Sequence, residues 1–198
     1  MTTATRSHPR YTPSAIALHW GMALLIVAVY GCMLASDNFP RGSDTYLLLR
    51  GLHYSLGLLV LPLACLRLAL VARQPRPAIV PAPAAWQEQL AHAMHWALYG
   101  FLIVMPLLGW LTLSAKGQPI PFFGLELPAL MGPDRATARN LEGIHELIGN
   151  LGFFLIGLHA AAALWHHYFM RDDTLERMLP LATRQPERGA QARLHRPS

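Results

Sequence analysis

Long stretches without a charged residue divide the chain. Residues 11–36, 51–66, 89–115 and 147–170 contain no Lys, Arg, Asp or Glu. A helix that crosses the hydrocarbon core of a bilayer needs about 20 mostly apolar residues. The pattern therefore predicts four transmembrane helices, at about residues 14–35, 49–72, 90–113 and 144–168. The second contains Arg67 near one end, where its aliphatic stem can carry the charge to the headgroups.

The polar segments give the rest of the organisation. We expect an N-terminal arm at residues 1–12, one membrane domain at residues 13–171 and a polar tail at residues 172–198. The connection at 73–85 is rich in proline and predicts an extended spacer. The connection at 116–140 mixes proline with apolar residues, which suits a cap on the membrane surface.

Composition agrees with a membrane protein. Hydrophobic residues make up 53% of the chain and charged residues 14%, against about a quarter charged in soluble proteins. A soluble enzyme, a nucleic-acid binder and a disulfide scaffold are disfavoured. Cys32 and Cys65 fall at different depths of the bilayer, so they are not expected to pair. The fold class expected is all-α, an integral membrane four-helix bundle in the lipid bilayer.

The basic residues predict the orientation. Four spans place both termini on one side. The N-terminal arm, the second connection and the tail together hold eleven Lys or Arg, and the other two connections hold five. The positive-inside rule then places the N- and C-termini in the cytoplasm.

Histidine is the unusual residue of the spans. Eight of the ten lie in or at the edge of a span: His19, His53, His92, His95, His145, His159, His166 and His167. Ionisable groups there are costly and usually functional. Hydrogen bonds between helices are one explanation. Metal-ion transport is another, but its only acidic ligands, Glu142 and Glu146, sit at the mouth of the last span. Haem ligation by neutral imidazole pairs is favoured.

Helical spacing pairs the candidate ligands. His145 and His159 are fourteen residues apart, roughly 21 Å along one helix and nearly on one face. They therefore lie near opposite membrane surfaces. The direction of the spans places His53 at the depth of His145, and His19 at the depth of His159. His92 and His95 compete with His19 at that depth.

A steric argument favours four of these histidines. A haem that is ligated to a helix lies close to its backbone and needs a small neighbour about one turn away. Four residues after His19, His53, His145 and His159 stand Ala23, Gly57, Gly149 and Ala163. The corresponding positions after His92 and His95 are Trp96 and Tyr99. The roles of His92 and His95 stay open.

His166 stands seven residues beyond His159 and keeps to the same helix face. Two interpretations are balanced. It anchors the helix at the interface together with Trp165 and Tyr168, or it donates a hydrogen bond to a quinone. His167 has no assigned role.

The chain also resembles the bacterial cytochrome b561 family from about Arg10 to Pro180. The resemblance rests on ordered motifs in all four spans: Leu18-His19-Trp20, His53-Tyr54-Ser55-Leu56-Gly57, Gly109-Trp110 with Ser114-Ala115-x-Gly117, His145-Glu146, Leu158-His159-Ala160-Ala161-Ala162, His166-His167, Arg171-Asp172 with Leu175, and Arg177-Met178-Leu179-Pro180.

This resemblance implies an oxidoreductase of the bacterial inner membrane with two haem b groups as cofactors. Their axial ligands are the pairs His19/His159 and His53/His145, and His166 lies near the quinone. The members most similar oxidise superoxide on the periplasmic side and reduce ubiquinone. Others are cytochrome subunits that pass electrons between a redox protein partner and quinone, so the donor stays open. A metal carrier without haem is a third alternative.

Positive residues on the outer side are candidates for attracting superoxide electrostatically. They are Arg41, Arg50, Lys116, Arg135 and Arg139. Each is equally well explained as a solvated loop charge or as a partner of a haem propionate.

Overall fold

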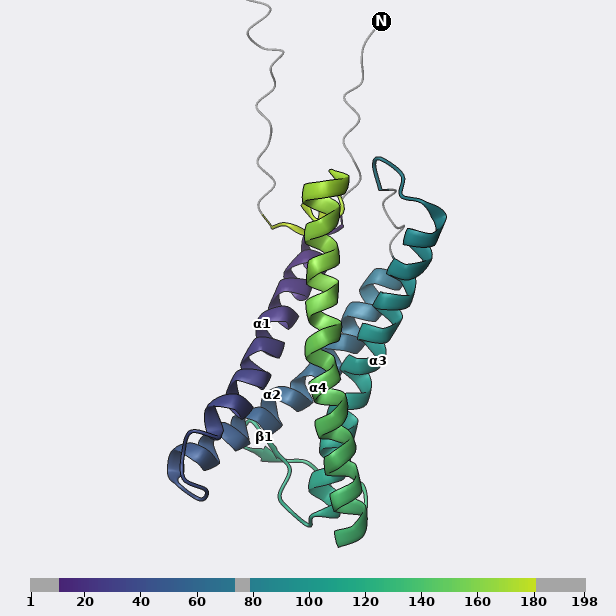
Figure 1. Cartoon of the computed structure of the whole chain (residues 1–198). Coiled ribbons are helices and arrows are strands. Elements are labelled where there is room, and N and C mark those ends of the chain that lie inside the picture. Colours follow the sequence, from purple (N-terminus) through teal and green to yellow (C-terminus); the bar gives the residue numbers. More distant parts are fainter. Residues whose placement is uncertain (1–10, 74–78, 181–198) are drawn as a thin grey trace, which may run out of the picture.

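A computed structural model describes residues 11–73 and 79–180. Four long helices run back and forth: α1 (Pro13–Ser36), α2 (Asp44–Ala72), α3 (Ala85–Ala115) and α4 (Arg135–Trp165) (Figure 1). All four are long and apolar enough to cross a membrane. The prediction of an all-α membrane bundle is confirmed.

Three of the four long helices, α2, α3 and α4, begin before their charge-free runs do. Ser43 caps α2 by accepting a hydrogen bond from Tyr46 N, and Asp134 caps α4 by accepting one from Thr137 N. Such caps let a helix start in polar sequence. The expected boundary of the third connection at residue 140 is therefore wrong, because Arg135 and Arg139 lie in the first turns of α4.

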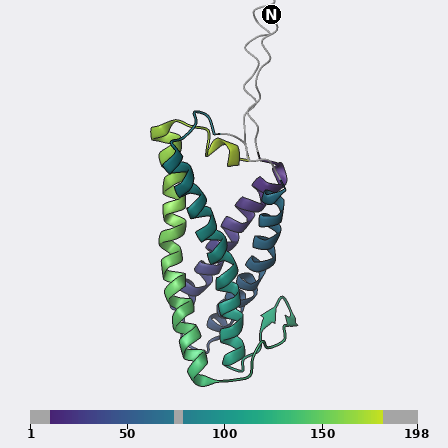
Figure 2. The same ribbon diagram turned by 90° about the vertical axis from the view of Figure 1, so that its right-hand side faces the viewer.

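The helices pack as two antiparallel pairs. Figure 2 shows α1 beside α2 and α3 beside α4, and α2 also packs against α3. Backbone contact between α1 and α4 is sparse, so these two helices meet mainly through side chains. This leaves room along α4 for groups larger than a packed side chain.

The outward faces suit lipid. Large apolar side chains such as Leu24, Leu147 and Phe154 are more than half exposed. The buried positions are few and mostly small, for example Ala15 and Ala64. In a bilayer the helices satisfy their own backbone groups and lipid covers the apolar side chains.

A short hairpin covers one end of the bundle. Strands β1 (Pro121–Phe122) and β2 (Leu125–Glu126) pair through a turn in which Phe123 and Gly124 both have positive φ, as in a type I′ turn. The hairpin was not predicted from sequence, because two-residue strands carry no periodicity. We call this end of the molecule the hairpin end.

The hairpin loop is fixed to the helices. Ile120 is buried with Leu58 of α2 and Leu113 of α3. Ser55 donates a hydrogen bond to the Pro121 carbonyl, and Trp110 Nε1 donates one to the Pro128 carbonyl. The expected cap is present, held by both apolar burial and hydrogen bonds.

The chain after α4 folds back over the opposite end. A π-helical turn (His166–Met170) continues α4, and a 3₁₀ turn (Glu176–Met178) follows. Arg177 is buried, and Trp20 of α1 donates a hydrogen bond to the Met178 carbonyl. The folded part therefore extends to residue 180 and includes the first residues of the segment expected as the tail. Residues 1–10, 74–78 and 181–198, including most of the arm and tail, lie outside the described residues.

Candidate functional site

Two histidines face each other at the hairpin end. The ring centres of His53 on α2 and His145 on α4 are 6.3 Å apart, with the rings steeply inclined. Two metal–nitrogen bonds of about 2 Å, together with the ring radii, separate two coordinating imidazoles by about 6 Å between centres. The pair is therefore spaced to hold one metal atom between the rings.

The Nδ1 atoms of these two rings have different surroundings. His53 Nδ1 lies 3.0 Å from the Val29 carbonyl of α1. A carbonyl only accepts, so Nδ1 carries the proton and Nε2 is free to bind a metal, as in many metal sites. His145 Nδ1 is buried and has no partner at hydrogen-bonding geometry, although the Met105 carbonyl is close enough to act on the ring.

A second pair lies at the opposite end. The ring centres of His19 on α1 and His159 on α4 are also 6.3 Å apart. His95 of α3 approaches His159 to 5.7 Å. Distance alone therefore does not separate His19 from His95. Exposure does, because the side chains of His19 and His159 are half-buried while His95 is exposed.

Arg67 stands beside this second pair. Its guanidinium donates a hydrogen bond of 3.1 Å to the Ala15 carbonyl, one turn before His19. It is close enough to both His19 and His159 to act on them electrostatically. Arg67 therefore joins α1 to α2 within the bundle.

Between the two pairs, α1 and α4 meet through aromatic side chains. Tyr30 donates a hydrogen bond of 2.7 Å to the Gly149 carbonyl and packs on Phe153 with ring centres 4.0 Å apart. A Cβ on Gly152 would lie 2.4 Å from the Phe101 ring and 2.5 Å from the Tyr30 hydroxyl. Only glycine fits at residue 152.

The small residues predicted beside the candidate ligands leave space to different degrees. A Cβ on Gly57, one turn after His53, would meet no atom within 4 Å. A Cβ on Gly149, one turn after His145, would meet only the end of the flexible Met105 side chain, at 3.4 Å. Both positions can admit a flat ring system.

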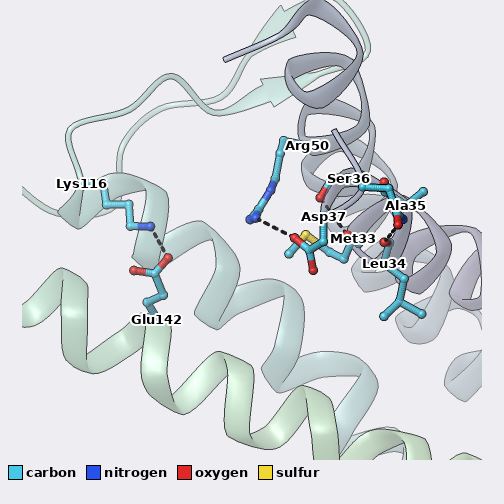
Figure 3. Close-up of polar contacts among 9 residues, drawn as sticks. Met33, Leu34, Ala35, Ser36, Asp37, Arg50, Lys116 and Glu142 are labelled. Carbon is cyan, nitrogen blue, oxygen red and sulfur yellow. Dashed lines mark hydrogen bonds and ion pairs between the residues drawn. The ribbon is translucent and has the colours of Figure 1, made fainter. Parts of the chain in front are cut away.

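The cationic residues at the hairpin end form two groups. Arg50 lies 3.8 Å from Asp37, and Lys116, the residue that follows α3, pairs with Glu142 of α4 at 2.5 Å (Figure 3). The guanidinium of Arg50 also lies over the ring of Tyr46. The Nε atom of Arg50 is buried without an acceptor. Arg50 can therefore donate a hydrogen bond to an anionic group near His53.

Three of the cations line an open cavity of about 520 Å³ where α3 ends and α4 begins. Its lining includes Lys116, Arg135 and Arg139 together with Glu142. Arg41 is exposed in the connection between α1 and α2 and does not line this cavity. The structure therefore brings together three of the five predicted cations.

His166 at the opposite end has a partner that the sequence analysis did not assign. Its Nδ1 lies 2.5 Å from Oδ2 of Asp172. His167 instead packs against Tyr168, with ring centres 4.9 Å apart. The two neighbouring histidines therefore have different surroundings.

The donor set fits haem better than a protein-bound metal ion. Within residues 11–73 and 79–180, no three His, Cys, Asp or Glu side chains gather as ligands. The imidazoles come in facing pairs across a loosely packed interface, and Arg50 offers an unsatisfied donor to a propionate. The facing imidazoles would hold the iron of a haem, and Arg50 would bind a propionate.

Comparison with known proteins decides the family. A family model described as prokaryotic cytochrome b561 matches residues 10–181. The chain belongs to the prokaryotic cytochrome b561 family. Members of this family transfer electrons across the membrane and bind b-type haem, and the chain is an inner-membrane protein.

Three relatives illustrate the range of the family. Cytochrome b561 homolog 1 of Escherichia coli (strain K12) is 40% identical over 86% of this chain and 97% of its own length. The probable superoxide oxidase CybB of Yersinia pestis is 35% identical over 87% and 97%. Cytochrome b561 homolog 2 of E. coli is 29% identical over 88% and 94%.

Three features of this structure were not predicted from the sequence. Asp172 stood in a motif but was placed in the tail, because the reversal of the chain after α4 has no apolar signature. Tyr30 was one aromatic residue among many in an apolar run. The contact of Arg67 with Ala15 depends on how α1 crosses α2, which spacing within one helix does not reveal.

Proposed function

We propose that this cytochrome b561 protein holds two b-type haems and oxidises superoxide at the hairpin end while reducing ubiquinone at the opposite end. One haem lies between His53 and His145, and the other between His19 and His159. When bound, the haems supply one-electron relay across the apolar part of the bilayer.

The spacing of the two histidine pairs carries the proposal. Both have ring centres 6.3 Å apart, and both draw one histidine from α4. The two α4 histidines are fourteen residues apart, roughly 21 Å along the helix. Each pair leaves a gap of the same size for a metal atom, and the two gaps lie at different heights along α4. This arrangement supports an electron path that crosses the membrane.

The cavity lined by Lys116, Arg135 and Arg139 supports an anionic substrate. A cationic mouth concentrates small anions and raises their rate of arrival. Superoxide gives up one electron and leaves as oxygen, so this step needs no base. The name of the Yersinia pestis relative, a probable superoxide oxidase, agrees with this substrate.

His166 supports quinone reduction at the opposite end. Quinone takes up two electrons and two protons to become quinol, and two superoxide ions supply the two electrons. His166 sits on the surface side of His159, where it can donate to a quinone carbonyl and recover a proton from water. By the distribution of basic residues, this end faces the cytoplasm.

A second candidate is an electron-carrier subunit that receives electrons from a redox protein. The open cavity of about 520 Å³ is far larger than a diatomic anion requires, which favours a partner's side chain as occupant. The E. coli relative at 40% identity is named only as a cytochrome b561 homolog.

The experiment is direct. Superoxide generated enzymatically should reduce the haems of the purified protein and, with a short-chain ubiquinone present, yield one quinol for two superoxide ions. Raising the ionic strength should slow the reaction, because it screens the cationic cavity. Failure of superoxide to reduce haem that dithionite reduces would reject the oxidase and leave the carrier.

A further inference from the structure

The chain reverses direction at the end of α4. After the π-helical turn, Arg171 adopts the left-handed conformation with φ 54°, and the Asp172 amide donates a hydrogen bond to the His166 carbonyl. This is one way in which helices end. The reversal directs the next side chain back onto the last turns of α4.

That side chain is the Asp172 carboxylate, and it is held from two sides. Oδ2 accepts from His166 Nδ1 at 2.5 Å, and Oδ1 accepts from the Thr174 amide at 3.0 Å. Only 3% of the side chain is exposed, whereas 21% of the His166 side chain is. The carboxylate is therefore enclosed, and the imidazole keeps an open edge.

The carboxylate is ionised in this setting. Burial by itself raises the pKa of Asp172, but the hydrogen bonds with His166 and Thr174 outweigh burial and hold that pKa below its ordinary value. An ionised carboxylate only accepts, so the proton between the two groups stays on His166 Nδ1.

We propose that Asp172 is a positioning residue that fixes the ring of His166 with Nδ1 protonated, so that Nε2 is the nitrogen that takes up a proton from water and passes it to quinone. This inference rests on the proposed quinone site. A buried carboxylate fixes the tautomer and the orientation of the histidine in catalytic His–carboxylate pairs.

The proton balance is simple. For each proton delivered, the Nε2–H bond of the imidazolium breaks and an O–H bond forms on the quinone oxygen. The imidazole left behind keeps its Nδ1–H bond to Asp172 and regains a proton at Nε2 from water. Two such cycles accompany the two electrons that reduce quinone to quinol.

Asp173 next door supplies a matched control. It forms an ion pair with Arg177, and its Oδ1 accepts from the Val80 amide at 3.0 Å. It thus tethers the segment before α3, and neither of these contacts involves His166. Asp173→Asn removes the same charge, one residue away, without touching the imidazole.

The first test follows the oxidation of dithionite-reduced haem by a short-chain ubiquinone in the purified protein. His166→Gln should slow this reaction about 100-fold and Asp172→Asn about tenfold, within the range of general acid catalysis. The double variant should be no slower than His166→Gln, because both changes disrupt the same His166–Asp172 pair. Asp173→Asn should keep the wild-type rate, and haem content should be unchanged in all four.

The outcomes separate the two claims. A slow His166→Gln with a fast Asp172→Asn rejects only the role of Asp172. A wild-type rate for His166→Gln rejects the quinone site at His166 and the inference with it. Additive losses in the double variant show that Asp172 acts elsewhere and also reject the inference.

A second test does not depend on quinone. In protein labelled with nitrogen-15 in histidine and reduced to its diamagnetic form, the His166 signals, assigned by their loss in His166→Gln, should show Nδ1 protonated. Asp172→Asn should shift the proton toward Nε2, because the amide can donate to Nδ1, and Asp173→Asn should not. An Nδ1 that is unprotonated in the parent protein contradicts the proposal.

Discussion

The two ends of the bundle carry histidine pairs of equal spacing in unequal surroundings. At the hairpin end, one pair is covered by a folded loop and lies near Arg50 and a cationic cavity. At the opposite end, the pair has a third histidine and Arg67 close by, and His166 with its carboxylate lies one to two turns beyond. Attraction of anions suits the first arrangement, and proton donation suits the second.

Both pairs draw one histidine from α4, while the other elements give the two ends different surroundings. His53 of α2 is hydrogen-bonded to the Val29 carbonyl of α1. His19 of α1 instead lies beside Arg67, which belongs to the neighbouring helix α2. The same imidazole pair can therefore serve a donor site or an acceptor site according to what surrounds it.

Removing a histidine at the hairpin end should remove one haem and leave the other. His53→Ala or His145→Ala should lower the haem content from two to one per chain, and ubiquinone should still oxidise the remaining reduced haem. His92→Ala is the control and should keep both. A His53→Ala or His145→Ala protein that keeps two haems, or that loses only the quinone-reactive one, breaks the assignment of the two ends.

The opposite end offers two candidates to pair with His159, and mutation should distinguish them. His19→Ala should lose the quinone-reactive haem, whereas His95→Ala should keep both haems with at most a shifted spectrum. The reason is that His95 is exposed and is followed one turn later by Tyr99. Loss of haem in His95→Ala with retention in His19→Ala would reverse the pairing.

The middle of the bundle should resist any side chain at Gly152. Its Cβ would come within 2.5 Å of Phe101 and Tyr30, and forcing an extra carbon into a packed interior costs about 1–3 kcal/mol. Gly152→Ala should therefore lower the thermal unfolding temperature in detergent. Gly157→Ala is the matched control, because its Cβ would meet nothing within 4 Å. Equal stability of the two variants would contradict the α1–α4 contact.

The basic residue near each pair should tune its own haem. Arg67→Gln should lower the midpoint potential of the quinone-reactive haem by on the order of tens of millivolts, because a nearby cation favours the electron-rich state. Arg50→Gln should lower the other one. Redox titration of both variants checks this, and a shift of the wrong haem in either would contradict the arrangement.

The smallest effect is expected at the cationic cavity. Arg135→Gln and Arg139→Gln should each slow superoxide-driven haem reduction by about twofold and weaken its dependence on salt. Reduction by a neutral reductant should not change. Arg41→Gln, outside the cavity, is the control for a general loss of charge.

Most of the fold followed from residue patterns that are local to one helix. Charge-free runs defined the four spans, and the spacing of His145 and His159 placed partners at two depths. In the structure, His53 lies opposite His145 and His19 lies opposite His159. These features depend on helical rise and direction, which a single sequence records.

Features that depend on contacts between elements were beyond the sequence. The first turns of α4 were predicted as a loop because Arg135 and Arg139 are charged. The Asp134 cap nevertheless lets the helix begin in this polar sequence. The return of Asp172 to His166 requires a reversal at Arg171, a residue whose type does not favour positive φ. The approach of His95 to His159 depends on how α3 lies against α4.

The most direct test of the account is the reduced-minus-oxidised visible spectrum of the detergent-purified protein, with haem counted per chain. The account predicts two b-type haems per chain, resolved as two redox steps. Protein made with ample haem supply that contains none, or only one that persists in both His53→Ala and His19→Ala, would contradict the assignment of the two histidine pairs.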